Sequence, residues 1–309
     1  MMPPLDPPAP GDGKPASSGS GKGGGDAAHM VIPDHQLIRC IGRGGYGQVW
    51  IARNSLGVYR AVKIVFRSDF DHDAPYLREL AGIRRFEPIS RSHEGFVDVL
   101  HVGINEAEQY FYYVMELGDD LNAGQDIRPE NYVPKTLRHA LRPGQPLPLA
   151  ECLRLGLALS LALSELHRLS YVHRDVKPSN IIFVHGVPKL ADIGLVAAIT
   201  GDSSYAGTDG FVPPEGPGRP AGDVYALGKV LYEASTGRDR RQYPALSEDT
   251  GKPEHPSELL EFYEVVVHAC AEDVRNRYQT AWEMHAHLLV LAVAAEVKLW
   301  ITSATIWEK

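Results

Sequence analysis

The sequence contains little cysteine, and this bears on two classes of protein. Cys40, Cys152 and Cys270 are the three cysteines in 309 residues, and they stand far apart, without the spacing of metal ligands. Disulfide-stabilised secreted domains and zinc-binding modules need several cysteines at short, defined spacings. Neither class is therefore expected, and the composition favours a reducing compartment, the cytoplasm.

Long apolar runs are also missing. A membrane-spanning helix requires about 18 or more apolar residues in succession, whereas the most apolar stretch, HLLVLAVAAEVKLW at 287–300, is interrupted by Glu296 and Lys298. The N-terminus lacks the apolar core of a signal peptide. We therefore expect no membrane segment and interpret 287–300 as a packing helix.

A surplus of basic residues is absent as well. The chain has 31 Lys and Arg against 39 Asp and Glu, which gives a net charge of −8. Nucleic-acid binding depends largely on surplus cationic side chains that neutralise phosphates. The sequence therefore predicts no nucleic-acid partner, although it allows local basic pockets.

The first 29 residues have almost nothing to bury. They consist mainly of Pro, Gly, Ser and Ala, and such a composition cannot offset the entropy lost on folding. The stretch GSGKGGG within them resembles a phosphate-binding loop, but no Ser or Thr follows Lys22 and no strand precedes it. We predict that residues 1–29 are disordered.

The rest of the chain begins with a pattern of strands. With 44% apolar residues, the chain can bury a large core. Between 36 and 66, short runs rich in Val, Ile, Tyr and Trp are broken by GRGGYG and NSLG, which predicts three antiparallel strands. A helix at 74–86 and strands at 96–104 and 110–117 would complete a small lobe.

A helical region follows a polar connection. Residues 118–134 are rich in turn-forming residues and longer than a compact domain requires, so we interpret them as an insertion that borders a cleft or serves as a docking surface. Beyond them the apolar residues recur at the helical period, and helices are predicted at 149–169, 222–236, 257–271 and 279–293. The expected fold class is α+β, with a five-stranded antiparallel lobe plus one helix and a larger, mainly helical lobe.

Three glycines lie between the first two predicted strands. In IGRGGYGQVW (41–50), Gly42, Gly44 and Gly47 would let the backbone approach a phosphate closely. An ordinary glycine-rich hairpin is one alternative. A dinucleotide site is another, but it requires a helix directly after the glycines, whereas QVWIAR has the pattern of a strand. The order of elements favours a flap over ATP.

A lysine interrupts the third predicted strand. In YRAVKIVF (59–66), Lys63 stands on an apolar strand, where a cation is costly unless it is paired. An edge-strand charge is the alternative interpretation. Glu79, in the predicted helix, is a suitable counter-ion, and such a pair would hold the ammonium against nucleotide phosphates.

An acid, a base and an amide are gathered in HRDVKPSN (173–180). Asp175 can accept a proton from an attacking hydroxyl, Lys177 can neutralise charge on a phosphoryl group, and Asn180 can bind magnesium. Twelve residues after Asn180, the turn LADIGL supplies Asp192, a carboxylate suited to a second magnesium contact. This combination indicates phosphoryl transfer.

The segments as a set resemble eukaryotic-type (Hanks-type) Ser/Thr protein kinases, over roughly residues 36–293. GRGGYGQV resembles the glycine-rich loop of that family, AVK its nucleotide lysine, HRDVKPSN its catalytic loop, DIG its D-F-G and PPE its A-P-E. GDVYALGKVLYEASTGR resembles the central helix of the large lobe. The resemblance implies a bilobal fold with an ATP cleft between the lobes.

The resemblance also divides the chain and assigns roles to residues. We expect a kinase domain at 30–293, made of an N-lobe and hinge (30–117), the insertion (118–134) and a C-lobe (135–293), followed by an extension at 294–309. The implied catalytic residues are Asp175, Lys177, Lys63 and Glu79. The implied ATP-binding residues are Ile41, Gly42, Gly44, Gly47, Val49, Ala61, Lys63, Met115, Glu116, Leu117 and Ile182. The implied Mg²⁺ ligands are Asn180 and Asp192.

Within these sets, particular functions are implied. Val49, Ala61 and Ile182 would enclose the adenine of ATP, Met115 would be the gatekeeper, and Glu116 and Leu117 would form the hinge; plain core positions are the alternative. Other residues would support the loop: His173 and Arg174 would orient it, Asp223 would anchor it, and Arg277 would pair with Glu215 rather than remain a surface charge.

The resemblance extends to substrate and regulation. Lys177, two residues after Asp175, is typical of Ser/Thr kinases, so protein substrates are expected, and the proline-rich head favours a bacterial member. Autophosphorylation is expected within 195–210, in trans between two copies of the chain, with Arg174 available to bind the phosphate. The hydroxyl residues of this region are Thr200, Ser203, Ser204, Tyr205 and Thr208. Of these, Thr208 is expected to shape the substrate cleft.

Two departures from the family pattern and two alternatives remain. Ile193 replaces the usual Phe, and activity is expected to survive because an aliphatic residue can fill the same pocket. Pro213 replaces the usual Ala. A pseudokinase that binds ATP without chemistry is the contrasting hypothesis, and a kinase for small molecules is a third. The presence of Lys63, Asp175 and Asp192 favours an active enzyme.

Overall fold

The computed structural model describes residues 30–44, 47–192, 197–198, 207–246 and 257–294. All elements named below belong to one compact unit, Ile32–Lys309. The predicted disorder of residues 1–29 and the departure at Ile193 lie outside the described residues.

The N-terminal part is a five-stranded antiparallel sheet, as predicted. Its strands are β1 (His35–Gly44), β2 (Gly47–Asn54), β3 (Tyr59–Phe66), β4 (Val99–Asn105) and β5 (Tyr110–Met115). The order across the sheet is β1-β2-β3-β5-β4. Runs of Val, Ile and aromatic residues favour these strands. The side chain of Asn54 closes the β2–β3 turn by accepting hydrogen bonds from the N–H groups of Leu56 and Val58.

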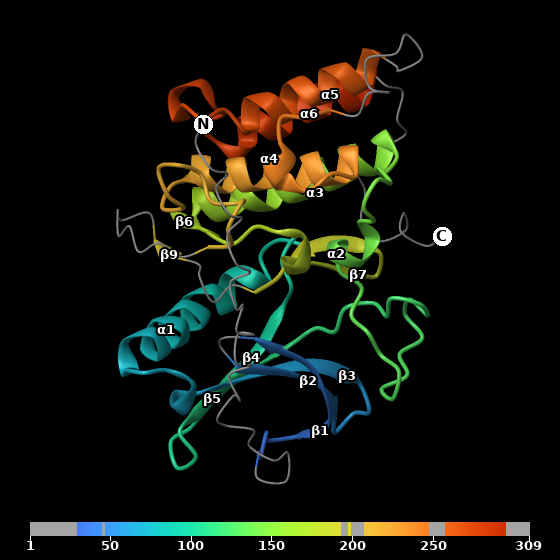
Figure 1. The fold of residues 1–309 in the computed structure, drawn as a ribbon. Helices are drawn as coiled ribbons and strands as arrows, with labels where there is room; N and C mark the ends of the chain where they lie inside the picture. The colour runs from blue at the N-terminus through green and yellow to red at the C-terminus, as the bar shows by residue number, and fades with distance from the viewer. Residues whose placement is uncertain (1–29, 45–46, 193–196, 199–206, 247–256, 295–309) are drawn as a thin grey trace, which may run out of the picture. The chain divides into compact units, whose positions relative to one another are not determined.

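One face of this sheet packs against helix α1 (Asp73–Ser90). The residue pairs Lys63↔Tyr113 and Val65↔Phe111 align β3 with β5. Because side chains alternate along a strand, these four share a face. The Tyr76 ring of α1 lies 5.1 Å from that of Phe111, between ring centroids. Figure 1 shows α1 beside the sheet.

The C-terminal part is mainly helical, again as predicted. Its helices are α2 (Leu137–Ala140), α3 (Leu149–Arg168), α4 (Pro220–Thr236), α5 (Ser257–Ala269) and α6 (Ala281–Ala294). In Figure 1 the last four are stacked in layers. Helix α4 is buried along nearly its whole length, so it is the centre of this core. No helix in the described part of the chain is both long and apolar enough to cross a membrane.

Two short ladders carry the segments of chemical interest. Strand β7 (Ile181–Val184) forms a hairpin with β8 (Val187–Leu190), and β6 (Tyr171–Val172) pairs with β9 (Ala197–Ala198). The Leu190 N–H donates a hydrogen bond to the carbonyl of Gly95 at 2.8 Å, and the Leu190 carbonyl accepts a hydrogen bond from the Val97 N–H at 3.0 Å. These backbone bonds join the helical part to the sheet part next to Asp192.

The insertion at 118–134 is held at both ends. The Asp119 carboxylate accepts hydrogen bonds from the N–H groups of His185 and Gly186, at 2.8 and 2.7 Å, in the turn between β7 and β8. On the opposite side, Arg39 of β1 donates to the carbonyl of Pro129 at 2.8 Å and to that of Tyr132. The insertion therefore connects the first strand of the sheet to the helical part.

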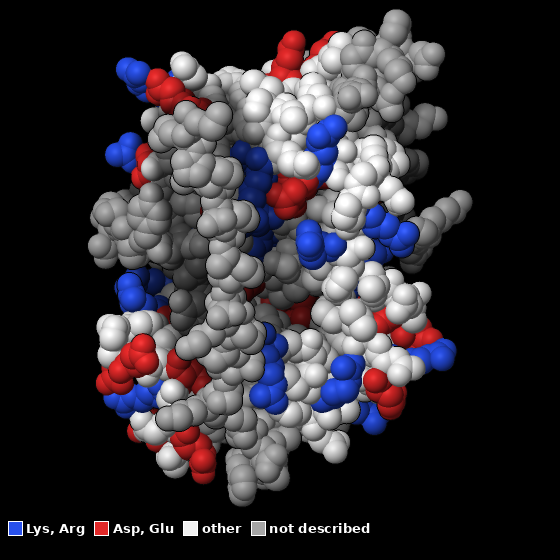
Figure 2. Space-filling view, viewed as in Figure 1, with Lys and Arg blue, Asp and Glu red and all other residues white. Residues whose placement is uncertain are grey.

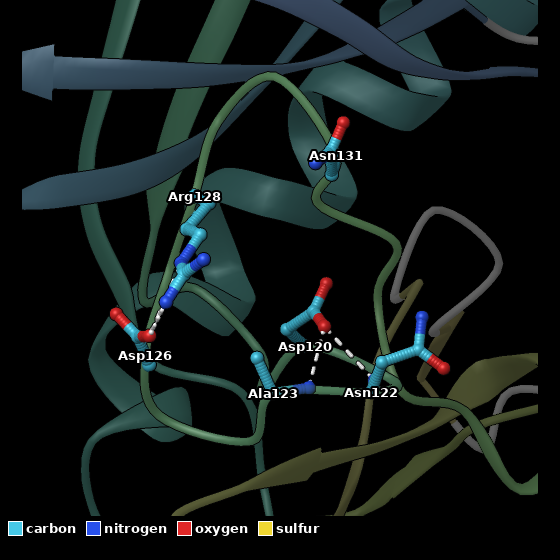
Figure 3. Close-up of a pocket in the computed structure, with 6 residues that line it drawn as sticks. All are labelled: Asp120, Asn122, Ala123, Asp126, Arg128 and Asn131. Atoms are coloured by element: carbon cyan, nitrogen blue, oxygen red, sulfur yellow. Dashed lines mark hydrogen bonds and ion pairs between the residues drawn. The ribbon is translucent and has the colours of Figure 1, made fainter.

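A shallow polar pocket lies within this insertion (Figure 3). Its volume is about 320 Å³. The Asp120 carboxylate accepts the N–H groups of Asn122 and Ala123, and Arg128 pairs with Asp126 on the other side of the loop. These bonds explain how a polar segment of this length is ordered. The docking role predicted for it stays a prediction.

Candidate active site

The segment 173–180 forms a closed network around the carboxylate of Asp175. Lys177 Nζ donates a hydrogen bond to Asp175 Oδ2 at 2.7 Å, and the Thr208 hydroxyl donates one to Asp175 Oδ1 at 2.8 Å. Lys177 also contacts Thr208 Oγ1 at 2.8 Å. Asn180 Nδ2 donates to Asp175 Oδ2 at 2.9 Å. The carboxylate is thereby fixed in orientation, as general-base chemistry requires.

Asp223 of α4 anchors this segment through its backbone N–H groups. Its buried carboxylate accepts the backbone N–H groups of His173 and Arg174 at 2.7 and 2.8 Å, and the ring nitrogen Nε2 of His167 lies 2.9 Å from it. Buried acceptors of this kind need several donors. The predicted anchoring by Asp223 is confirmed, whereas the support from His167 was not predicted.

Lys63 lies between two carboxylates. Its Nζ is 3.1 Å from Glu79 Oε1 of α1 and 2.9 Å from Asp192 Oδ1. The predicted ion pair with Glu79 is therefore present. Burial by itself lowers the pKa of Lys63, but Tyr113, Asp192 and Glu79 together raise the pKa well above its ordinary value. The ammonium thus stays charged where anionic phosphates would need it.

Asp192 connects Lys63 with the segment around Asp175. Lys63 holds the pKa of Asp192 below its ordinary value against the opposite effect of burial, and Lys177 and His173 act in the same direction as Lys63. Lys177 also contacts Asp175 directly. Lys177 thus contacts one of the two carboxylates that the sequence selects and acts electrostatically on the other. Asp192 adopts a left-handed backbone, φ 55°, which Asp tolerates in a tight turn.

The predicted ATP-binding residues are brought together from five strands. Gly42 of β1 pairs with Val49 of β2, Val49 pairs with Lys63, and Ala61 pairs with Met115 at the end of β5. A Cβ built on Gly118, just after the hinge, would lie 2.5 Å from Cγ2 of Ile182, so Ile182 borders the hinge. The nucleotide contacts of these residues stay a prediction.

The glycine-rich turn needs glycine for a steric reason at one position. Gly44 and Gly47 face each other where β1 meets β2. Gly47 has φ 108°, and a Cβ there would lie 2.2 Å from the carbonyl oxygen of Ile64. Only glycine fits. Ile41 and Gly42 precede this turn and are half-buried.

The family model for the protein kinase domain matches residues 35–288. The chain belongs to this family. The bilobal kinase fold, with a five-stranded sheet and helix followed by a mainly helical lobe, is therefore confirmed.

Several curated bacterial kinases are similar to this kinase domain. The serine/threonine-protein kinase PrkC of Bacillus subtilis is 29% identical over 278 residues, 82% of this chain and 40% of PrkC. The serine/threonine-protein kinase PknA of Mycobacterium tuberculosis is 34% identical over 220 residues, 66% of this chain and 47% of PknA. The probable serine/threonine-protein kinase PkwA of Thermomonospora curvata is 28% identical over 274 residues, 83% of this chain and 34% of PkwA. The chain thus spans less than half the length of these relatives.

The hinge of this kinase domain contains a contact that sequence reasoning missed. The Glu116 carboxylate accepts the Asp98 N–H at 2.9 Å and pairs with Lys189 Nζ at 2.6 Å. Lys189 belongs to β8, so this ion pair joins the hinge to the helical lobe. The Glu116 side chain therefore has a structural function, and its predicted contact with adenine would involve its backbone.

The ion pair predicted between Arg277 and Glu215 is also present. Arg277 Nη1 lies 2.5 Å from Glu215 Oε1, and Nη2 lies 3.3 Å from Oε2. The Arg277 side chain is fully buried. The interpretation as a surface charge is therefore wrong. Arg277 also donates to the carbonyl of Ala221 in α4 at 3.0 Å, so it joins the segment of Glu215 to that helix.

The residues expected to hold Mg²⁺ have suitable oxygen donors. Among the residues that the structure describes, no group of three or more His, Cys, Asp and Glu could hold a metal ion. Mg²⁺ in nucleotide sites is usually bound by one or two protein oxygens together with substrate phosphates and water. The Asp192 side chain is 48% exposed, and Lys63 lowers the pKa of its carboxyl group, which favours the anionic form that binds a cation. Asn180 donates through Nδ2 to Asp175, and its Oδ1 accepts a long hydrogen bond from the Ser179 hydroxyl at 3.5 Å, which leaves the second lone pair of this oxygen for a metal. These two residues fit Mg²⁺ bound together with a nucleotide.

Surface charge on the visible face is mixed. Figure 2 shows Lys and Arg interspersed with Asp and Glu over both lobes. Both signs of charge are thus present on this face, in a chain whose net charge is −8.

Proposed function

We propose that this kinase domain transfers the γ-phosphoryl group of MgATP to Ser or Thr hydroxyls of proteins. One observation carries the proposal: Lys177 contacts Asp175 at 2.7 Å and also acts on Asp192, which Lys63 holds at 2.9 Å. A general base, a metal-binding carboxylate and two cations thus converge. Phosphoryl transfer depends mainly on such positioning and charge neutralisation.

Each residue has a defined task in this proposal. Asp175 orients the attacking hydroxyl and accepts its proton, while Lys177 and Lys63 neutralise charge on the phosphate oxygens. Glu79 holds Lys63 in place. Asp192 and Asn180 would bind Mg²⁺, which when bound offsets the negative charge of the phosphates. Thr208, bonded to both Asp175 and Lys177, orders the cleft where the hydroxyl would enter.

Protein hydroxyls are the proposed substrates for two reasons. Lys177 follows Asp175 by two residues, as in Ser/Thr kinases, and the relatives bear the name serine/threonine-protein kinase. The Arg277–Glu215 pair supports the segment of Pro213, which would border a peptide groove. Protein substrates are therefore favoured over small molecules.

A pseudokinase is the competing candidate. Such a protein would bind ATP as a scaffold and would usually have lost the lysine or one of the carboxylates. Here all three are present: Lys63 pairs with Asp192, Lys177 pairs with Asp175, and the charge of Lys177 also lowers the pKa of Asp192. The intact network supports an active enzyme.

Transfer of label from [γ-³²P]ATP to a generic protein acceptor tests the proposal. With Mg²⁺, the wild-type protein is expected to label casein or myelin basic protein on Ser and Thr, and to lose the signal when Mg²⁺ is chelated. Asp192→Ala, which removes the proposed metal ligand, is expected to label at background level. Wild-type labelling no greater than that of Asp192→Ala would favour the pseudokinase.

We also propose autophosphorylation between residues 195 and 210. Thr200, Ser203, Ser204 and Tyr205 lie outside the described residues, and Thr208 is bonded to Asp175. Mass spectrometry after incubation with MgATP is expected to find phosphate in this segment. Mixing with a Lys63→Met copy would separate transfer in trans from transfer in cis. Phosphate found only elsewhere would reject this site.

A further inference from the structure

Tyr113 is a buried polar residue to which the proposed mechanism gives no task. It lies on β5 directly opposite Lys63 on β3, and 1% of its surface is exposed. Directly opposed residues on antiparallel strands project from the same face of the sheet. The Lys63 ammonium lies 5.7 Å from the centre of the Tyr113 ring. Buried tyrosines usually find a partner for their hydroxyl, and here the ammonium is the neighbouring charged group.

The number of donors on the Lys63 ammonium bears on what Tyr113 can do beside it. A lysine ammonium has three N–H donors. Asp192 Oδ1 accepts a hydrogen bond from Nζ at 2.9 Å, whereas Glu79 Oε1, 3.1 Å from Nζ, forms an ion pair without the geometry of a hydrogen bond. A side-chain hydrogen bond with Lys63 is among the interactions that act on the Tyr113 phenol. Its phenol is kept neutral because burial raises its pKa, although Lys63 opposes this rise, so the oxygen can accept a hydrogen bond.

We propose that Tyr113 is a positioning residue that holds the Lys63 ammonium in place for the nucleotide phosphates. Its importance for phosphoryl transfer rests on the function proposed above, whereas its hold on Lys63 does not. Asp192 is the partner that would turn to Mg²⁺ when MgATP is bound, so Glu79 and Tyr113 would then be the protein groups that still restrain Lys63. Tyr113 itself is fixed by its ladder partners on both sides, Lys63 and Val102.

The first test uses the ligand-free protein. We would compare wild type with Tyr113→Phe, which keeps the ring and removes the oxygen, and with Tyr112→Phe, a matched control. Tyr112 is the next residue along β5, is 5% exposed and pairs with Ile64, so its side chain projects from the opposite face. The measurement is the NMR order parameter of the Lys63 side chain, together with the melting temperature.

Tyr113→Phe is expected to lower the order parameter of Lys63 while Tyr112→Phe leaves it unchanged. An unchanged order parameter in Tyr113→Phe would overturn the proposal, whatever the kinase assay gives, because no nucleotide is present. A fall in both variants, or a large fall in melting temperature, would also contradict it, since the effect would then reflect general loosening of the sheet.

The second test is a double-mutant cycle on nucleotide affinity. Calorimetry would measure MgADP binding to wild type, Tyr113→Phe, Lys63→Met and the double variant. Loss of one hydrogen bond predicts roughly three- to tenfold weaker binding for Tyr113→Phe in the wild-type background. In the Lys63→Met background the same change should have no effect, because the group that it positions is gone.

An equal loss in both backgrounds would mean that Tyr113 acts on the site generally and would contradict the proposal. Absence of nucleotide binding to the wild-type protein would instead reject the proposed function. In that case the order parameters measured without nucleotide still decide whether Tyr113 holds Lys63, so the two failures are distinguishable.

Discussion

Asp175→Asn is expected to reduce phosphoryl transfer by roughly 10²- to 10⁴-fold, the usual contribution of a general base. The amide keeps the shape of the carboxylate but has one acceptor oxygen instead of two and cannot take up the proton of the hydroxyl. In the wild-type protein, Asp175 accepts hydrogen bonds from Lys177, Thr208 and Asn180. The amide of the variant therefore also disturbs this network.

The measurement is the rate of label transfer from ATP, combined with MgADP affinity and thermal melting. Asp126→Asn is the matched control: the same substitution at a carboxylate that is 64% exposed in the insertion, where wild-type rates are expected. Nucleotide binding by Asp175→Asn should stay near wild type because the proposed phosphate and metal contacts come from other residues. A variant that transfers phosphate at a wild-type rate would contradict the role assigned to Asp175.

Arg277→Met is expected to produce the largest loss of stability. The guanidinium donates to Glu215 and to the carbonyls of Ala221 and Ala271, and the closest contacts are 2.5, 3.0 and 2.8 Å respectively. Removing one partner of a buried ion pair typically costs about 3–5 kcal/mol. The lower end applies here because the Glu215 side chain is 26% exposed and can regain water.

Thermal unfolding would measure this loss, and a fall in melting temperature on the order of 10 °C is expected for a domain of this size. Arg275→Met provides a control two residues away. Arg275 is 84% exposed and pairs with Asp273, so its loss should leave the melting temperature close to that of the wild type. Similar melting temperatures for the two variants would show that burial does not decide the effect.

Some contacts could be predicted from the sequence because a local pattern and the family resemblance agreed. A lysine on an apolar strand needs a counter-ion, and Glu79 was the expected partner, which the 3.1 Å contact confirms. For that pair, the cost of burying an unpaired charge restricted the choice. The family resemblance alone identified Asp223 as the anchor of the loop and Arg277 as the partner of Glu215, and the structure contains both contacts.

Other contacts could not be predicted, because no local sequence pattern indicates them. Arg39 stands on a strand with other polar residues, and its contacts with the carbonyls of Pro129 and Tyr132 depend on how a segment 90 residues away folds back. The Glu116–Lys189 pair likewise depends on the docking of the β7–β8 hairpin. Tyr113 is one aromatic residue in a run of them, and the strand register distinguishes it from Tyr112. Such contacts require the tertiary arrangement.

The most direct measurement is a crystal structure of the protein with Mg²⁺ and a non-hydrolysable ATP analogue. The account predicts one triphosphate with its phosphates contacting Lys63, a metal bound by Asp192 and Asn180, and the terminal phosphate facing Asp175. A nucleotide bound elsewhere, or a metal that does not contact Asp192, would contradict it.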